Sequence, residues 1–158
     1  MANVKPVPEG YATITPYLCI DGAADAIDFY VKVFGAKERM RMGAPGGKIG
    51  HAELEIGDSV VMLADEFPDM AFRSPKTIGG SSVVIHLYVD DCDAVIDAAV
   101  KAGSRVVQET EDRFYGDRSG QIEDPYGHNW NVSTHIEDVP PEEMAKRVAA
   151  MEAEMGSA

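Results

Sequence analysis

The chain contains an internal repeat, which limits the folds that it can adopt. The segment YLCIDGAADAIDFYVKVFG begins at residue 17 and returns 69 positions later as HLYVDDCDAVIDAAVKAG. The identical pairs are Leu18 with Leu87, Asp21 with Asp90, Ile27 with Ile96, Asp28 with Asp97, Val31 with Val100 and Lys32 with Lys101. A register of 70 then lays Gly50, Glu53 and Gly57 over Gly120, Glu123 and Gly127. Two ordered sets of matches predict two copies of one structural unit.

Each copy has the pattern of one strand, one helix and three further strands. Ile27 and Tyr30 in the first helical segment, like Ile96 and Ala99 in the second, stand at the spacing of one helix face. Gly35 stands where a glycine commonly follows a helix. The expected strands are residues 14–20, 37–42, 49–56 and 59–63, and then residues 83–89, 105–109, 119–123 and 129–133. The sequence therefore predicts an α+β fold of two βαβββ units.

The remaining segments join or follow the two copies. Residues 65–82 contain two prolines and a Gly-Gly pair, so we expect an irregular linker. Pro140 and Pro141 are typical of a helix start, and a stripe of methionines and Val148 predicts a C-terminal helix over about 140–155 that packs against other apolar surface. With 158 residues and this duplication, we expect a single domain spanning 1–158, with units at about 13–64 and 83–134.

Charge and cysteine content exclude several classes of partner. Lys and Arg number 14 against 27 Asp and Glu, and the resulting net charge of −13 disfavours binding to nucleic acid or anionic lipid. No apolar run approaches the roughly 20 residues that span a bilayer, and no secretory signal is present, so we expect a cytoplasmic protein. Cys19 and Cys92 lack zinc-ligand spacing and are expected to be reduced, buried thiols.

Two motifs resemble those of the vicinal oxygen chelate superfamily, which includes glyoxalase I, bleomycin resistance proteins and extradiol dioxygenases. They are the Asp-Phe-Tyr step at residues 28–30 and the Asp-Pro-x-Gly-x-x-Trp turn at residues 124–130. The stretch TPYLCIDG is similar to the PhnB-like branch. The resemblance covers about residues 13–134 and implies a cupped eight-stranded mixed sheet, a small-molecule ligand inside the cup and a homodimer.

The resemblance also implies four positions at which metal-dependent members carry His or Glu. Here they hold Thr15, Met62, Val84 and Asn131. None of these residue types makes a strong ligand for zinc, nickel or iron. We therefore expect no metal cofactor, with a divalent metal at a non-standard position as the alternative.

Histidines on two strands are the best candidates for catalysis. His86 lies two residues after Val84, so alternation places it on the same face, where it could act as a general base or bind a ligand. The equally weighted alternative is a histidine that only satisfies a neighbouring polar group. His51 and Glu53 could share one face and bind a metal or transfer a proton. The alternative favoured by their residue types is an exposed edge strand.

Aromatic and basic residues complete the expected ligand site. Tyr17 and Tyr88 open the two units and could line a cleft, although strand aromatics are more often core. Tyr115 and Arg118 lie in the motif YGDRSG. Arg118 could bind a carboxylate or phosphate, or could instead form a structural salt bridge with Asp117, Glu123 or Asp124.

Two residues near the Asp-Pro turn are expected to lie outside the ligand site. Trp130 precedes Asn131, so alternation directs its ring toward the outer helix, where an indole serves as packing. His128 is expected to be an exposed turn residue.

Two functions remain open at this level. The first is a metal-free binding protein of the bleomycin-resistance type, whose acidic charge would suit a cationic ligand. The second is a glyoxalase-like lyase or isomerase that uses His51, Glu53 or His86 with a metal or as acid and base. The C-terminal helix could instead contact a protein partner. Nothing in the sequence names a substrate.

Overall fold

The computed structural model describes residues 4–155 and contains two compact units. Unit 1 holds the described residues up to Ser82 together with Tyr126–His128. Unit 2 holds Val83–Pro125 and the described residues from Asn129 onward. Within residues 4–155, no helix is long and apolar enough to cross a bilayer.

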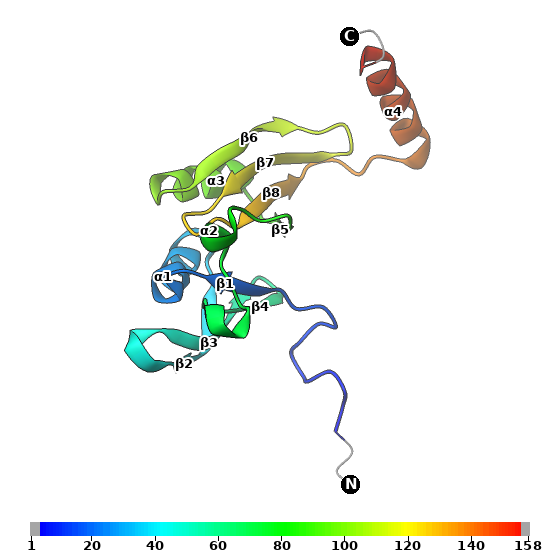
Figure 1. The fold of residues 1–158 in the computed structure, drawn as a ribbon. Helices are drawn as coiled ribbons and strands as arrows, with labels where there is room; N and C mark the ends of the chain where they lie inside the picture. The colour runs from blue at the N-terminus through cyan, green and yellow to red at the C-terminus, as the bar shows by residue number, and fades with distance from the viewer. Residues whose placement is uncertain (1–3, 156–158) are drawn as a thin grey trace. The chain divides into compact units, whose positions relative to one another are not determined.

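Each unit contains the predicted series of one strand, one helix and three strands (Figure 1). In unit 1 these are β1 (Tyr17–Ile20), α1 (Ala23–Phe34), β2 (Lys37–Gly43), β3 (Ile49–Ile56) and β4 (Ser59–Asp65). In unit 2 they are β5 (Val84–Tyr88), α3 (Cys92–Lys101), β6 (Arg105–Asp112), β7 (Asp117–Glu123) and β8 (Asn129–His135). The α+β fold inferred from the repeat is confirmed.

The two mixed sheets have equivalent topology. Their strand orders are β1-β4-β3-β2 and β5-β8-β7-β6, and in each the first and last strands of the unit are parallel neighbours. Tyr17 pairs with Met62 in unit 1, and the residues 69 positions later, His86 and Asn131, pair in unit 2. The repeat therefore extends to strand register.

Strand ends differ from the predicted boundaries where side-chain patterns were weak. Strand β1 begins at Tyr17, because Ile14 is exposed and does not pair, while Met62 donates its backbone N–H to the carbonyl of Pro16. Strand β6 extends beyond its predicted end at residue 109, since its polar residues continue to pair with β7 as far as Asp112 and Arg118. Backbone pairing, rather than apolar alternation, sets these boundaries.

The segment after β4 is more regular than predicted. It contains the 3-10 turn η2 (Pro68–Met70) and the one-turn helix α2 (Pro75–Ile78). Another 3-10 turn, η1 (Pro45–Gly47), lies between β2 and β3. Ser74 caps α2, because its side chain accepts the N–H of Thr77. The expectation of a wholly irregular linker was wrong, since a serine cap and a first-turn proline suffice for one helical turn.

A buried carboxylate of β4 anchors helix α1 in unit 1. Asp65 Oδ1 accepts the backbone N–H groups of Gly22 and Ala23, at 3.1 and 3.0 Å. Its Oδ2 accepts the N–H of Ile49 at 2.6 Å. Because Gly22 has no side chain to cap the helix, Asp65 provides the acceptor that a helix N-terminus needs.

The core of unit 2 centres on Trp130 in β8. This side chain is 1% exposed, and its Nε1 donates to Asp124 Oδ2 at 2.9 Å. Strand β8 packs against α3, whose buried face contains Cys92, Ile96 and Ala99. The sequence-based assignment of Trp130 to packing agrees with this position.

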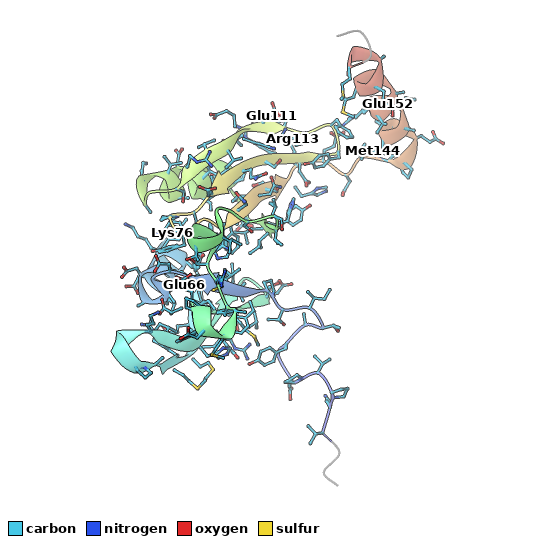
Figure 2. All side chains as sticks on the ribbon, in the orientation of Figure 1. Glu66, Lys76, Glu111, Arg113, Met144 and Glu152 are labelled. Carbon is cyan, nitrogen blue, oxygen red and sulfur yellow. The ribbon has the colours of Figure 1, made fainter. Side chains whose placement is uncertain are left out.

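Helix α4 (Pro141–Met155) follows unit 2's sheet, and Arg147 links it to residues that precede the helix. The Arg147 guanidinium donates to Glu137, to Glu143 and to the carbonyl of Phe114. Met144, which Figure 2 labels on this helix, is half-buried, as are Val148 and Met151. None of the described α4 side chains is fully buried, so the expected packing role is only partly fulfilled within this chain.

Candidate functional site

Four side chains of unit 1 form a continuous hydrogen-bond network. Tyr17 Oη lies 2.9 Å from His51 Nδ1, and His51 Nε2 lies 3.2 Å from Glu53 Oε1. Tyr11 Oη donates to the second carboxylate oxygen, Glu53 Oε2, at 2.6 Å. We call Tyr11, Tyr17, His51 and Glu53 the unit-1 network.

The position of β3 explains how the unit-1 network assembles. Residues two apart on a strand share a face, so His51 and Glu53 lie side by side. Strand β3 lies between β2 and β4, and Glu53 is only 6% exposed. The edge-strand alternative was therefore wrong, because strand order, which a single sequence does not show, places this strand inside the sheet.

The hydrogen bonds fix the direction of the unit-1 network. The hydrogen bond from Tyr11 is the main cause of a lowered pKa of Glu53, with a smaller contribution from His51, while burial opposes the shift. An ionised carboxylate only accepts, so His51 Nε2 carries a proton. In the tautomer that carries its single ring proton on Nε2, Nδ1 is the acceptor for the Tyr17 hydroxyl. Burial raises the pKa of Tyr17, which keeps this hydroxyl protonated at neutral pH.

An apolar cavity of about 390 Å³ opens beside Tyr17. The Tyr17 ring packs against Phe72 and His51, with ring centroids 5.4 Å apart in both pairs. Phe67 and Phe72 are joined by an isolated β-bridge, which closes the loop around η2. The lining residues of this unit-1 cavity are Tyr17, Gly50, Ala64, Phe67, Met70 and Phe72. Aromatic walls beside a few polar groups are typical of a small-molecule site.

Removing the Tyr11 hydroxyl tests the electrostatics of the unit-1 network. We expect Tyr11→Phe to raise the pKa of Glu53, because the principal hydrogen bond to its carboxylate is lost. A lowered folded-state pKa stabilises the protein above the unfolded value near 4.3, so the cost of Tyr11→Phe should disappear as pH falls through the folded-state pKa. Carboxyl ¹³C NMR titration measures the shift. Tyr88→Phe is the control, and an equal shift of Glu53 in both variants would contradict this assignment.

Unit 2 carries a different polar group on the corresponding strand. Asn131 Nδ2 donates to His86 Nδ1 at 3.0 Å, and the His86 ring lies 4.6 Å from that of Tyr88. Tyr88 Oη donates to Asp117 Oδ2 at 2.9 Å. His86 and Tyr88 are therefore neighbours, as strand alternation predicts, and both are exposed. Among the described residues, no carboxylate is hydrogen-bonded to His86, whereas Glu53 is hydrogen-bonded to His51.

His135 was not identified from the sequence, although it binds two aspartates. Its Nδ1 lies 2.7 Å from the buried Asp117 and its Nε2 lies 3.0 Å from Asp138. The hydrogen bond with Asp117, followed by that with Asp138, raises the pKa of His135. Its place at the end of a strand, two residues beyond the predicted boundary, gave no signal of this contact.

The YGDRSG motif does not form one site. Arg118 binds Asp93 of α3 in a bidentate pair and also Asp112, so it serves as a structural salt bridge, although not with the partners expected. Tyr115 instead lines a cavity of about 700 Å³ in unit 2, near α4. Glu111 and Arg113, labelled in Figure 2, line the same cavity and pair with each other.

His128 is buried rather than exposed, which corrects the sequence-based expectation. Its Nε2 donates to the carbonyl of Cys19 at 3.0 Å, and both residues belong to unit 1. A contact across more than a hundred residues of sequence leaves no local pattern. Cys19 and Cys92 are buried thiols, as expected, and burial is the main cause that raises the pKa of Cys19 to about 11.

The positions that bind metal in the family do not fit a metal here. The Thr15 hydroxyl donates to the carbonyl of Ala12, and Asn131 Nδ2 donates to His86 and Ser133. Met62 and Val84 offer no nitrogen or oxygen ligand. Across residues 4–155, no three His, Cys, Asp or Glu side chains gather in a group suited to a metal ion. The expectation of a metal-free protein remains a prediction.

Comparison with known proteins assigns the family. The sequence model of the glyoxalase/bleomycin resistance protein/dioxygenase superfamily matches residues 11–132. A Mycobacterium bovis protein described as uncharacterised is 42% identical over 145 residues, which cover 90% of this chain and 91% of the relative. The chain therefore belongs to the glyoxalase/bleomycin resistance protein/dioxygenase superfamily.

Solved structures agree with this assignment. TioX from Micromonospora has a TM-score of 0.60 and 26% identity, over 79% of this chain and 99% of TioX. The PhnB protein from Bacillus cereus has a TM-score of 0.61 and 16% identity, over 78% of this chain and 99% of that protein. The second likeness shows the fold alone, so membership of a PhnB-like branch stays a proposal.

Proposed function

We propose that the protein binds a small organic molecule in the unit-1 cavity, without the metal that many members of the superfamily use. The observation that carries this proposal is an apolar cavity bordered by Tyr17, Phe67 and Phe72, directly beside the polar unit-1 network. Aromatic walls favour a flat or apolar ligand, and Tyr17, whose hydroxyl is hydrogen-bonded to His51, supplies a polar group that can orient it.

Overall charge supports a preference for cationic ligands. The net charge of −13 produces a potential that attracts positive ions and repels negative ones. We further propose that the protein acts as a homodimer, in line with the superfamily resemblance. Light scattering of the purified full-length protein measures this state directly.

Titration with three indoles tests ligand binding. We expect tryptamine to bind more tightly than indole, and indole more tightly than indole-3-acetate, with differences that shrink in high salt. The ¹³C-methyl NMR signal of Met70, which lines the cavity, should shift, whereas that of Met144 on α4 should not. Phe72→Ala should weaken binding by about tenfold, because one aromatic wall is lost.

A matched control separates the two units. Phe114→Ala removes a partly exposed ring from the 700 Å³ cavity of unit 2 and should leave affinity unchanged. Unchanged affinity in Phe72→Ala, or equal shifts at Met70 and Met144, would contradict binding in unit 1.

The unit-1 network also supports a second candidate function, that of a lyase or isomerase of the glyoxalase-like group. A histidine oriented by a buried carboxylate is the usual arrangement of a general base. Metal analysis of protein purified without chelators distinguishes the forms of this chemistry. Stoichiometric divalent metal that is lost in His51→Ala or His86→Ala would favour a metal enzyme and reject metal-free binding.

A further inference from the structure

The structure assigns to Tyr17 the role of the group that exchanges a proton with the bound ligand, activated by His51 and Glu53. The ligand class is an apolar or aromatic compound with an acidic C–H or O–H group. This inference rests on the proposed binding of a small molecule in the unit-1 cavity. It places the reacting atom on a tyrosine, rather than on the histidines suggested by sequence.

The argument begins with the order of the three groups. Glu53 is buried and accepts from His51 Nε2, which leaves Nδ1 directed at the Tyr17 hydroxyl. This is the arrangement of a nucleophile, a base and a carboxylate that orients the base. Tyr11 holds the other carboxylate oxygen at 2.6 Å, so Glu53 cannot readily rotate away from His51.

Tyr17 is the member of the unit-1 network that lines the cavity. It is 47% exposed, and its ring contacts Phe72, which borders the same cavity. Neither His51 nor Glu53 lines the cavity. A ligand in the cavity therefore meets the phenol, and His51 acts through it.

Tyr88 provides an internal comparison. It is 60% exposed, yet its hydroxyl donates to the carboxylate of Asp117. A carboxylate is a weaker base than an imidazole, with an ordinary pKa near 4 against about 6.5. The pKa is raised in both tyrosines, mainly by burial in Tyr17 and mainly by the hydrogen bond to Asp117 in Tyr88, so the comparison rests on the accepting group. The hydroxyls of Tyr17 and Tyr88 thus donate to bases of different strength. Tyr88, which has the weaker base, is the more exposed of the two.

The proton transfer balances without a cofactor. The ligand's C–H or O–H bond breaks, its electron pair remains on the ligand as an anion, and the proton bonds to Tyr17 Oη. At the same time the original Tyr17 proton moves to His51 Nδ1, and Glu53 compensates the imidazolium charge. Return of both protons restores the resting state after the ligand has rearranged.

Acetylation by N-acetylimidazole measures the activation of Tyr17 directly. The phenol oxygen forms a bond to the acetyl carbon, the bond from that carbon to the imidazole nitrogen breaks, and the phenol proton passes by way of the base to the departing imidazole. We expect Tyr17 to be acetylated at least about fivefold faster than Tyr88 at neutral pH. This factor is small compared with the rate enhancement that a positioned base can supply. Peptide mass spectrometry gives both rates in one sample.

Variants of the base complete this test. His51→Gln should reduce the Tyr17 rate to that of Tyr88 or below, and Glu53→Gln should reduce it in part, while the Tyr88 rate stays constant. Circular dichroism confirms that each variant is folded. A Tyr17 rate no higher than that of Tyr88, or one unchanged by His51→Gln, would overturn the inference.

A reactive probe tests proton transfer from a ligand. 5-Nitrobenzisoxazole loses its ring C–H proton to a base while its N–O bond breaks, and it yields a coloured cyanonitrophenolate. We expect turnover that falls at least about tenfold in Tyr17→Phe. No turnover, or turnover retained in Tyr17→Phe with His51 as the base, would reject the role of Tyr17. If titration with the indoles still shifts the ¹³C-methyl signal of Met70, the proposed binding function stands. Only the proposed proton transfer is then rejected.

Discussion

Trp130→Ala should destabilise the protein by about 4 kcal/mol, the largest effect that we expect from one substitution. Truncating a fully buried tryptophan removes a large apolar surface and leaves a cavity, which costs roughly 3–5 kcal/mol. Trp130 is 1% exposed and also donates to Asp124, which is 3% exposed. A buried carboxylate that loses a donor adds to the cost. Urea denaturation measures the free energy of unfolding of the variant and of the original protein.

One further variant separates the effect of lost side-chain volume from that of the lost hydrogen bond, and a second serves as a control at a partly exposed ring. Trp130→Phe keeps an aromatic ring but removes the donor to Asp124, so we expect about half of the alanine effect. Phe114→Ala, at a ring that is 37% exposed, should cost well under about 1 kcal/mol. Equal costs for Trp130→Ala and Phe114→Ala would show that Trp130 is not the core residue described.

Asp65→Ala should destabilise the protein by about 3 kcal/mol. Its carboxylate accepts three backbone N–H groups, from Gly22, Ala23 and Ile49. Leaving buried donors without an acceptor costs roughly 1–3 kcal/mol each, and water that enters the space recovers part of this cost. The loss should appear in urea unfolding and as faster amide exchange at the start of α1.

An acidic residue in the first turn of α1, the turn whose backbone N–H groups Asp65 accepts, is the control. Asp25 is exposed in the first turn of α1, where a carboxylate interacts favourably with the helix dipole, so Asp25→Ala should cost at most about 0.5 kcal/mol. A comparable loss in both variants would mean that general charge near the helix N-terminus, rather than the three hydrogen bonds of Asp65, stabilises α1.

The fold was predictable because the same pattern of strands and helix occurs twice in the sequence, so each copy supports the assignment of the other. Each helix and strand of the βαβββ unit was inferred in both copies, and residues such as Tyr17 and His86 occupy equivalent registers in the two sheets. The strand ends that were missed, such as β6 as far as Asp112, are polar and pair only through backbone groups. Such pairing leaves little trace in side-chain alternation.

The candidate site was predictable only in part. Alternation correctly placed His51 beside Glu53, because this pair lies on a single strand. The contact of Tyr11 with Glu53 joins residues 42 positions apart, and no local pattern records it. The same reason explains the missed contact between His135 and Asp117, and it also explains why the salt-bridge partners of Arg118 were not those expected.

A crystal structure of the full-length protein with tryptamine, grown without chelators, tests the central claim most directly. We expect density for the indole ring against Tyr17, Phe67 and Phe72, and no anomalous signal from a transition metal. The opposite result would be a metal ion held by protein side chains, with the unit-1 cavity empty of ligand. That result would contradict metal-free binding in unit 1.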